Sequence, residues 1–200
     1  MNYITDILYW ISSGLLVPVI LILIFFFLRS LLLLGGFFNQ YLTMRQSGVM
    51  LHREMKTLTA DNLMTLPERL PKGRLPIVTY MEKMVEHRGS AAKINHLIDE
   101  YECMAERELE TSKMFAKMGP MTGLMGTLIP MGPALVGLSS GDIASMAYNM
   151  QVAFATTVIG LFAGGVGFVV KSVRQRWYRR DMSALNYIAD MLNENSDNPS

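Results

Sequence analysis

The sequence predicts an all-α membrane protein with three transmembrane helices, and the distribution of charge leads to this fold class. Half of the 200 residues are hydrophobic and 18% are charged, but the charges are unevenly spread. No charged residue occurs in residues 7–28, 118–141 or 143–170. A helix needs about 20 largely apolar residues to cross the hydrocarbon core of a bilayer, and all three stretches reach that length.

The first apolar stretch is expected to be a retained membrane anchor, not a cleaved signal peptide. No Lys or Arg precedes Arg29, the apolar run is long, and no clean small-x-small cleavage site follows it. We predict a transmembrane helix over residues 8–34 that Pro18 can kink and that Gly35 and Gly36 loosen at its inner end. Arg29 lies near this end, where its side chain can reach toward the headgroups.

The placement of Lys and Arg predicts the orientation. Apart from Arg29, twelve lie between residues 45 and 117 and five between residues 171 and 180, whereas none lies in residues 137–142. Under the positive-inside rule the central region and the C-terminal tail face the cytoplasm, and the N-terminus faces outside. The sequence thus predicts a multi-pass protein of the cytoplasmic (inner) membrane. The single Cys103 falls in the cytoplasmic region, so no intramolecular disulfide can form.

The predicted segments follow in order along the chain. A connection rich in Pro and Gly at residues 61–78 separates helices of the cytoplasmic region. Ser90 can cap a long helix that begins near residue 91 and runs into the second span. An amphipathic helix reaches residue 193, and residues 194–200 are expected to be disordered. The complete assignment is an outer segment at 1–7, spans at 8–34, 113–136 and 143–170, a cytoplasmic helical domain at 35–112, an outer loop at 137–142, and a cytoplasmic C-terminal helix and tail at 171–200.

Small residues and hydroxyls share helical faces in the last two spans. Gly119, Gly123 and Thr127 recur at a spacing of four residues. Small residues let membrane helices approach closely, and threonine has little use on a lipid-facing surface. These stripes predict tightly packed helices with a threonine-lined path. On the third span the stripe consists of Ala153, Thr157, Gly160, Gly164 and Gly167.

Each hydroxyl in these spans has two interpretations. Thr127 can bond a carbonyl one turn back in its own helix, which is favoured for this residue taken alone, or it can line a pore and bond water or a proton in transfer. Thr157 belongs at a helix interface, whereas the adjacent Thr156 faces about 100° away and can bond its own helix. Three prolines in the second span mark either a mobile kink or a static irregularity, and neither is favoured. They are Pro120, Pro130 and Pro133.

No Asp, Glu, Lys, Arg or His lies in residues 118–141 or 143–170, which make up most of the second span and all of the third. A self-sufficient proton carrier needs a titratable group at membrane depth, so a moving proton would require a carboxylate from another chain. The sequence also lacks P-loop, dinucleotide, zinc-ligand and nucleophile motifs, so an enzyme, a metal or cofactor site and a nucleic-acid partner are not expected. The acidic residues between 99 and 110 form a solvated helix face by default, with a docking surface as the alternative.

Two motifs in these spans resemble those of the MotA/TolQ/ExbB proton channel family. Residues 119–127 read Gly-Pro-Met-Thr-Gly-Leu-Met-Gly-Thr, which is similar to the family motif Pro-x-x-Gly-Leu-x-Gly-Thr. Residues 153–161 read Ala-Phe-Ala-Thr-Thr-Val-Ile-Gly-Leu, which is similar to the family motif Ala-x-x-Thr-x-x-Gly-Leu. The three-span layout, with an outer N-terminus and a large inner loop, resembles TolQ and ExbB more than MotA, which has one more span.

The resemblance implies a homo-oligomeric ring of five chains around a dimer of a single-span partner, similar to ExbD, TolR or MotB, that carries an aspartate in its membrane helix. It also implies an ion path at Thr127, Thr157 and Thr156. TolQ and ExbB carry a glutamate five residues before the third-helix threonine, where this chain has Val152, and the missing charge is typical of a MotA-like pore. Residues expected to serve helix packing and kinking are Pro120, Gly119, Gly123, Gly126, Gly160 and Gly164.

The leading functional hypothesis is therefore the ring, or stator, subunit of an ion-driven membrane motor. Proton flow, with sodium as the alternative ion, would turn the ring and the partner against each other. A membrane scaffold that anchors a cytoplasmic helical docking domain without conducting ions is the alternative. A self-contained transporter is a third hypothesis, which the lack of intramembrane charge opposes.

Overall fold

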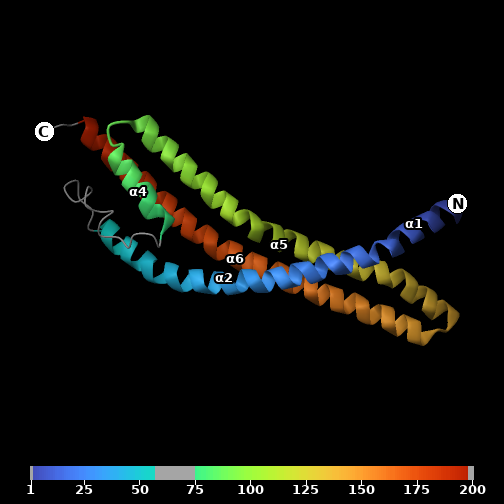
Figure 1. Cartoon of the computed structure of the whole chain (residues 1–200). Helices are drawn as coiled ribbons and strands as arrows, with labels where there is room; N and C mark the ends of the chain where they lie inside the picture. Colours follow the sequence, from blue (N-terminus) through green and yellow to red (C-terminus); the bar gives the residue numbers. More distant parts are fainter. Residues whose placement is uncertain (1, 57–74, 198–200) are drawn as a thin grey trace. The chain divides into compact units, whose positions relative to one another are not determined.

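The computed structural model describes residues 2–56 and 75–197, and every secondary-structure element within them is an α-helix, which confirms the predicted all-α class. The connection predicted at residues 61–78 falls mostly outside the described residues. The helices are α1 (Asn2–Gly14), α2 (Leu16–Lys56), α4 (Pro76–Glu86), α5 (Ala91–Ser140) and α6 (Ile143–Asp197) (Figure 1).

Three of these helices contain an apolar stretch long enough to cross a membrane, in agreement with the predicted three spans. The first is Leu16–Leu42, and the other two lie within α5 and α6. The long helix expected to run into the second span is present, because α5 continues without a break from Ala91 to Ser140. Ser90 stands directly before it, and its carbonyl accepts the N–H groups of Lys93 and Ile94.

The chain is helical from Asn2, and one interruption falls inside the span expected at residues 8–34. Here α1 ends at Gly14 and α2 begins two residues later, so the helix is interrupted at Leu15. Pro18 explains this position, because proline has no N–H to donate to the carbonyl of Gly14, four residues before it. The kink expected from Pro18 thus falls one turn before the proline itself.

The described chain divides into two compact units. We call residues 1–35 with 111–171 the apolar unit, and residues 36–110 with 172–200 the polar unit. Helices α2, α5 and α6 each contribute a segment to both units. Most of the charged residues belong to the polar unit, whereas the charge-free parts of α5 and α6 belong to the apolar unit.

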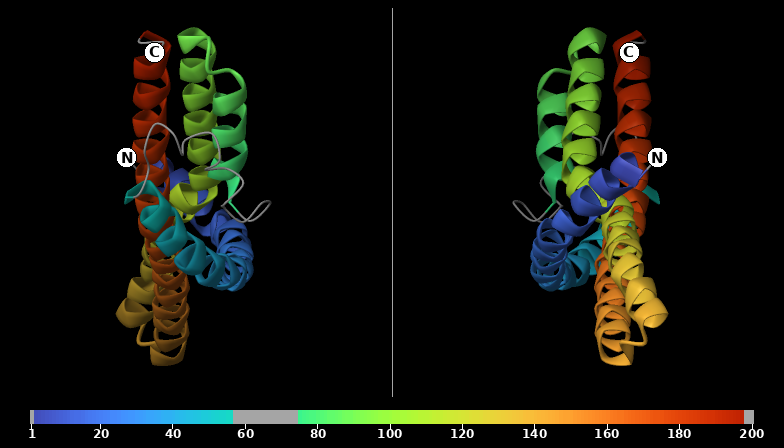
Figure 2. Two further views of the ribbon diagram at one scale, coloured as in Figure 1. Left: turned by 90° about the vertical axis from the view of Figure 1, so that its left-hand side faces the viewer. Right: turned by 90° about the vertical axis from the view of Figure 1, so that its right-hand side faces the viewer.

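In the apolar unit, α5 and α6 form an antiparallel hairpin and lie side by side (Figures 1 and 2). The turn between them is tight because Gly141 takes a φ of 75°, which favours glycine. The N–H of Asp142 donates to the carbonyl of Gly137 (2.8 Å), and the Asp142 carboxylate accepts the N–H of Ser145 (3.0 Å). Asp142 therefore caps the start of α6, and much of the loop predicted at 137–142 is the last turn of α5.

Glycines bring the backbones of α5 and α6 into contact. A Cβ atom added at Gly160 would lie 2.6 Å from the Cα of Gly123, and one added at Gly119 would lie 2.7 Å from the backbone nitrogen of Gly164. A Cβ atom added at Gly164 would lie 2.5 Å from the Cδ of Pro120. These contacts leave no room for a side chain, so the predicted glycine stripes meet between two helices of one chain.

Helix α2 packs against one side of this hairpin. The ring of Phe26 meets the ring of Phe115 edge-on, with centroids 5.2 Å apart, and Ala163 is buried in the same cluster. One residue along, the ring of Phe27 lies against Phe162, with centroids 5.6 Å apart. Aromatic pairs of this kind contribute about 0.5–1.5 kcal/mol beyond the burial of their area, so they fix α2 on this side.

The polar unit has its own core between α4, α5, α6 and the end of α2. Tyr80 of α4 meets Tyr101 of α5 edge-on with centroids 5.2 Å apart, and Trp177 of α6 stacks on Phe37 of α2 with centroids 5.9 Å apart. Helix α6 persists to Asp197, past residue 194 where disorder was predicted. Fully buried aliphatic side chains of this core are Ile77, Met81, Met84, Ile94, Leu185 and Ile188.

Gly160→Ala is expected to destabilise the hairpin by roughly 1–3 kcal/mol, because the added methyl group requires the backbone at Gly123 to move away. Gly165→Ala is the matched control on the same helix, since no atom lies within 4 Å of a Cβ added there. Thermal unfolding in detergent, followed by circular dichroism, should give a lower midpoint for Gly160→Ala than for Gly165→Ala. Equal midpoints would contradict the glycine interface.

Candidate functional site

Thr156 lies inside the α5–α6 contact. Its side chain is 5% exposed, and a Cβ atom added at Gly126 would lie 2.6 Å from the Cβ of Thr156. The Thr156 hydroxyl is within bonding distance of two carbonyls of its own helix, those of Val152 (3.0 Å) and Ala153 (2.8 Å). Its polar group is therefore satisfied inside α6. Thr156 is thus the threonine that lies in the glycine contact of α6, whereas the spacing in the sequence had suggested Thr157.

Thr127 and Thr157 are half-buried at the border of the same contact. The Thr127 hydroxyl donates to the carbonyl of Leu124 (2.7 Å), and the Thr157 hydroxyl donates to the carbonyl of Ala153 (3.2 Å). Both are bonded within their own helices, as one of the two interpretations of Thr127 expected. The Ala153 carbonyl also accepts the shorter bond from Thr156, so the Thr157 bond is the weaker of the two.

Thr127 and Thr157 occupy the same level and the same side of the hairpin. Gly126 of α5 and Thr156 of α6 meet across the helix contact, and Thr127 and Thr157 are the next residues along their helices. One step along a helix turns the position by about 100°, and in two antiparallel helices this step carries both positions to the same side of the pair. The structure therefore brings together two threonines that lie thirty positions apart in the sequence.

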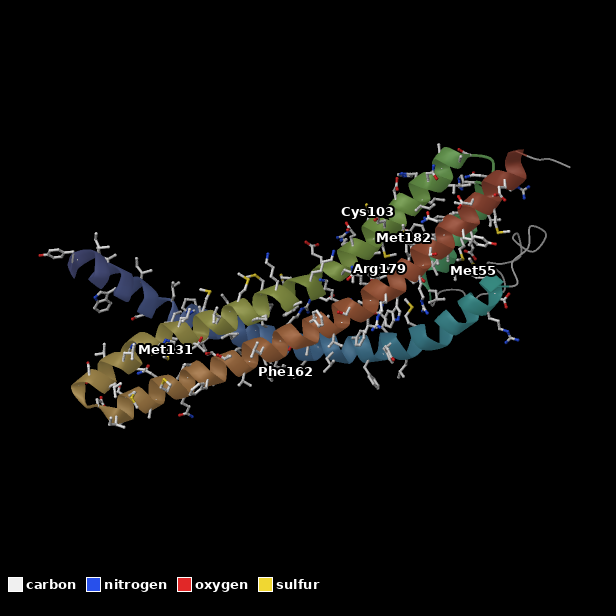
Figure 3. The ribbon with its side chains drawn as sticks, turned by 180° about the vertical axis from the view of Figure 1, so that it is seen from behind. Met55, Cys103, Met131, Phe162, Arg179 and Met182 are labelled. Carbon is white, nitrogen blue, oxygen red and sulfur yellow. The ribbon has the colours of Figure 1, made fainter. Side chains whose placement is uncertain are left out.

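Helix α2 occupies the opposite side of the hairpin. Phe162 contacts α2 and comes one residue before the buried Ala163, whereas Thr157 comes one residue after the buried Thr156. Phe162 and Thr157 therefore lie on opposite sides of the contact. Met131 of α5 and Phe162 of α6 mark the two helices of the hairpin in Figure 3. We call the side away from α2 the open face. It carries Thr127 and Thr157 together with the exposed side chains of Leu124, Met131, Phe154 and Leu161.

The open face offers hydroxyl groups and no acidic or basic side chain, since residues 118–141 and 143–170 contain no Asp, Glu, Lys, Arg or His. Val152, which stands where a glutamate occurs in TolQ and ExbB, is half-buried one turn before Thr156. Among the residues that the structure describes, no three His, Cys, Asp or Glu side chains gather as a metal site. The chemistry available on this face is hydrogen bonding, without a proton acceptor of its own.

The prolines of α5 add a backbone acceptor that the sequence reasoning missed. The helix is continuous through Pro120, Pro130 and Pro133. A proline donates no N–H, so the carbonyl four residues before it loses its usual helical donor. For Pro130 this carbonyl belongs to Gly126, which lies at the level of the threonines. The four-residue spacing between Gly126 and Pro130 was visible in the sequence. That Gly126 packs against Thr156 of the other helix was not, because it depends on how the two helices align.

A second set of polar groups is buried in the polar unit. The Tyr101 hydroxyl donates to Oδ2 of Asp181 at 2.7 Å, and both side chains are buried. Burial raises the pKa of the Asp181 carboxyl, and the bond from Tyr101 and the charge of Arg180 oppose this shift only in part. Sequence reasoning did not single out these residues. The available signal was that Asp181 lies one helical turn before the apolar Leu185, on the face of α6 that is buried.

The same network joins α2, α5 and α6 in the polar unit. The Tyr178 hydroxyl donates to the Glu108 carboxylate, and burial together with this bond raises the pKa of Tyr178. Arg174 donates through Nη2 to Oε1 of Gln40 (2.7 Å) and through Nη1 to the Glu108 carbonyl (3.4 Å). Glu108, an exposed residue of the predicted acidic helix face, thus also accepts a bond that links α5 to α6.

A groove of about 730 Å³ runs between α5 and α6 in the polar unit. Arg179 and Met182 mark its α6 side in Figure 3. Acidic groups outnumber basic ones along it, so it suits a cationic or amphipathic segment better than an anionic one. Its charged residues are Glu102, Glu106, Asp190 and Arg179, and apolar residues beside them are Ala105, Leu109 and Met182.

A comparison with models of protein families matches residues 72–186 to the MotA/TolQ/ExbB proton channel family. The match spans more than half of the chain and includes α4, α5 and most of α6. No curated protein and no solved structure matches the chain. Both motifs on which the resemblance was based lie inside the matched region, so the match confirms it.

Asp181→Asn is expected to gain stability over the unmodified protein as the pH rises. Because the folded state raises the pKa of Asp181, the stabilisation from its bound proton is complete below the unfolded pKa and is lost as the pH rises toward the folded pKa. The amide cannot ionise and can still accept the bond from Tyr101. Thermal midpoints measured between about pH 4 and about pH 8 should diverge accordingly. Asp99→Asn, at an exposed position of α5, is the control, and a pH-independent difference for Asp181→Asn would count against this assignment.

Proposed function

Because the chain belongs to the MotA/TolQ/ExbB proton channel family, we propose that it is the ring subunit of an ion-driven membrane motor. The observation that carries the proposal is the pairing of Thr127 and Thr157 on the open face of the α5–α6 hairpin. The two hydroxyls lie at one level on the side away from α2, and they are polar groups on a surface that is otherwise apolar. Such a step is what an ion needs to pass through hydrocarbon-like surroundings.

The titrating group in this proposal belongs to another chain. The spans of this chain contain no carboxylate, and proteins of this family work in complexes with single-span partners. In the proposed complex, five copies of the chain surround a dimer of such a partner, whose membrane helix carries an aspartate. The open faces of the ring then turn inward toward the partner, and α2 lies on the outside, toward the lipid.

The proposed cycle starts with the partner's aspartate at the level of the two threonines. Taking up a proton, or binding sodium as the alternative ion, neutralises the aspartate, and a neutral group crosses the apolar wall at far lower cost than a charged one. The Thr157 hydroxyl can turn from the Ala153 carbonyl toward the carboxyl group, because its existing bond is long. Release of the ion on the cytoplasmic side restores the charge and favours movement to the next subunit.

The proposal places the protein in the inner membrane with its N-terminus outside and its C-terminus in the cytoplasm. The distribution of Lys and Arg supports this orientation, since the turn at residues 137–142 has none and the segment after residue 170 has five. The polar unit then lies in the cytoplasm. Thr156 serves helix packing in this scheme, because its hydroxyl is buried against Gly126.

A membrane scaffold without ion conduction is the second candidate function. The groove between α5 and α6 in the polar unit is the observation that favours it, because a partner of basic or amphipathic character would fit there. The two functions differ in their dependence on the threonines, since a scaffold that docks partners in the polar unit has no use for a hydroxyl on the open face.

Thr127→Val combined with Thr157→Val is expected to lower ion flux by roughly tenfold or more, because valine keeps the shape and removes both hydroxyls. The measurement is proton or sodium uptake by liposomes that contain the chain together with a single-span partner protein that co-purifies with it. Thr122→Val is the matched control. Thr122 is buried on α5, donates to the Met118 carbonyl (2.7 Å) and precedes Gly123 by one residue, so it turns toward α2.

Assembly must be measured alongside flux, by co-purification of the partner with each variant. Normal assembly with unchanged uptake in the double variant would refute the proposed ion path and favour the scaffold. Loss of uptake in the Thr122→Val control as well would show that the effect is one of helix packing.

A further inference from the structure

Two exposed lysines stand on α5 just before its charge-free stretch begins. Lys113 and Lys117 both belong to the apolar unit, and both side chains are exposed. They are four residues apart, so they lie on one face of the helix about one turn from each other. Like charges at this spacing repel each other, and an anion placed between them relieves the repulsion.

The two lysines continue the open face toward the end that is proposed to face the cytoplasm. Lys113 precedes Met131 by 18 residues, which is five full turns, and Lys117 precedes Leu124 by seven residues, which is within about 20° of two turns. Met131 and Leu124 belong to the open face, and α5 is continuous over this range. The lysines therefore lie on the side that carries Thr127, at about 15 Å and about 21 Å from it along the helix axis.

The other two helices of the apolar unit carry their first cations at the same level. On α2, Arg29 follows Phe26 by three residues, and Phe26 meets Phe115, which lies between the two lysines of α5. On α6, Lys171 follows Gly167 by four residues, and a Cβ atom added at Gly167 would lie 2.7 Å from the Cβ of Phe115. Each cation is thus about one turn or less from Phe115 along the helices, which in the proposed orientation is the level of the inner headgroups.

The apolar unit has no carboxylate at this end. Its acidic residues are Asp6, near the start of α1, and Asp142, in the turn between α5 and α6. The nearest carboxylate along α5 is that of Glu110, which is three residues from Lys113 but seven residues, or about 10 Å, from Lys117. Glu110 therefore lies to one side of the pair, and an anion between the two lysines has to come from outside the apolar unit.

We propose that Lys113 and Lys117 bind a carboxylate-bearing segment of the single-span partner, on the cytoplasmic side of that partner's membrane helix. This inference rests on the proposed function, in which the open face turns toward the partner. Two ammonium groups one turn apart complement an acidic segment, and their attraction fixes the height of the partner's helix against Thr127. The phosphate of an anionic lipid is the competing occupant. Arg29 is the better placed of the cations for that role, because it is exposed on α2, on the lipid side of the proposed ring.

The test joins the two chains chemically. A carbodiimide condenses a lysine amine with a carboxyl group in contact with it to form an amide, and the reagent takes up the water that is released. The chain is purified together with the single-span partner, treated with the reagent and digested for mass spectrometry. We expect amide links from Lys113 or Lys117 to an Asp or Glu of the partner. A bound partner without links at either lysine would overturn this inference alone, whereas failure of any such partner to co-purify would count against the proposed function as well.

Salt resistance of the complex provides the second measurement. Lys117→Gln is expected to lower, by roughly twofold or more, the NaCl concentration at which half of the partner dissociates, because salt then screens a weaker attraction. Arg29→Gln is the matched control, since it removes one exposed cation at the same level from α2. An equal decrease in Arg29→Gln would show a general effect of membrane charge and would overturn the inference.

A charge-preserving variant covers the case in which the glutamine variant folds poorly. Lys113→Arg combined with Lys117→Arg keeps both charges, but a guanidinium does not form the amide. We expect the salt resistance of the unmodified complex together with loss of the links. Links that persist would show that other lysines make them and would overturn the inference. The lipid alternative is measured by the phosphatidylglycerol that the purified chain retains, and loss of that lipid in Lys117→Gln with unchanged salt resistance would assign the pair to lipid instead.

Discussion

The backbone contact between α5 and α6 is the constraint on which the rest of the apolar unit depends. Lipid tails are as apolar as the helices, so no hydrophobic force drives the two helices together, and close atomic contact must hold them. Glycines at 119, 123, 160 and 164 provide that contact by removing the side chains that would separate the backbones. Once this register is fixed, every other residue of the two helices has a defined level and side.

The positions of the threonines follow from this register. Thr156 and Thr157 are adjacent in sequence, but the contact at Gly126 takes the first into the interface and leaves the second at its border. Because the helices are antiparallel, the border residue of α5, Thr127, reaches the same side as Thr157. The side that α2 covers is occupied instead by aromatic rings, so the hairpin separates a polar step on one side from an apolar contact on the other.

Much of this arrangement could be predicted from the sequence, and what was missed depends on contacts between distant residues. The charge-free stretches gave the three spans, and the spacing of Gly119, Gly123, Gly160 and Gly164 gave the glycine faces. Periodicity alone could not decide between Thr156 and Thr157, because the contact runs between them and only the facing Gly126 selects one. Tyr101 and Asp181 were missed for a similar reason, since they are eighty positions apart and neither is unusual until they meet.

The hydroxyls on the open face combine two requirements that usually conflict. In a bilayer an unsatisfied hydroxyl costs free energy, and the bonds from Thr127 to the Leu124 carbonyl and from Thr157 to the Ala153 carbonyl avoid that cost. A helical carbonyl also accepts an N–H from the next turn, so it is not left without a donor when the threonine turns away. The Gly126 carbonyl differs, because Pro130 removes its helical donor. At this level α5 and α6 therefore carry two hydroxyls that are bonded within their own helices and one carbonyl, that of Gly126, that receives no N–H from Pro130.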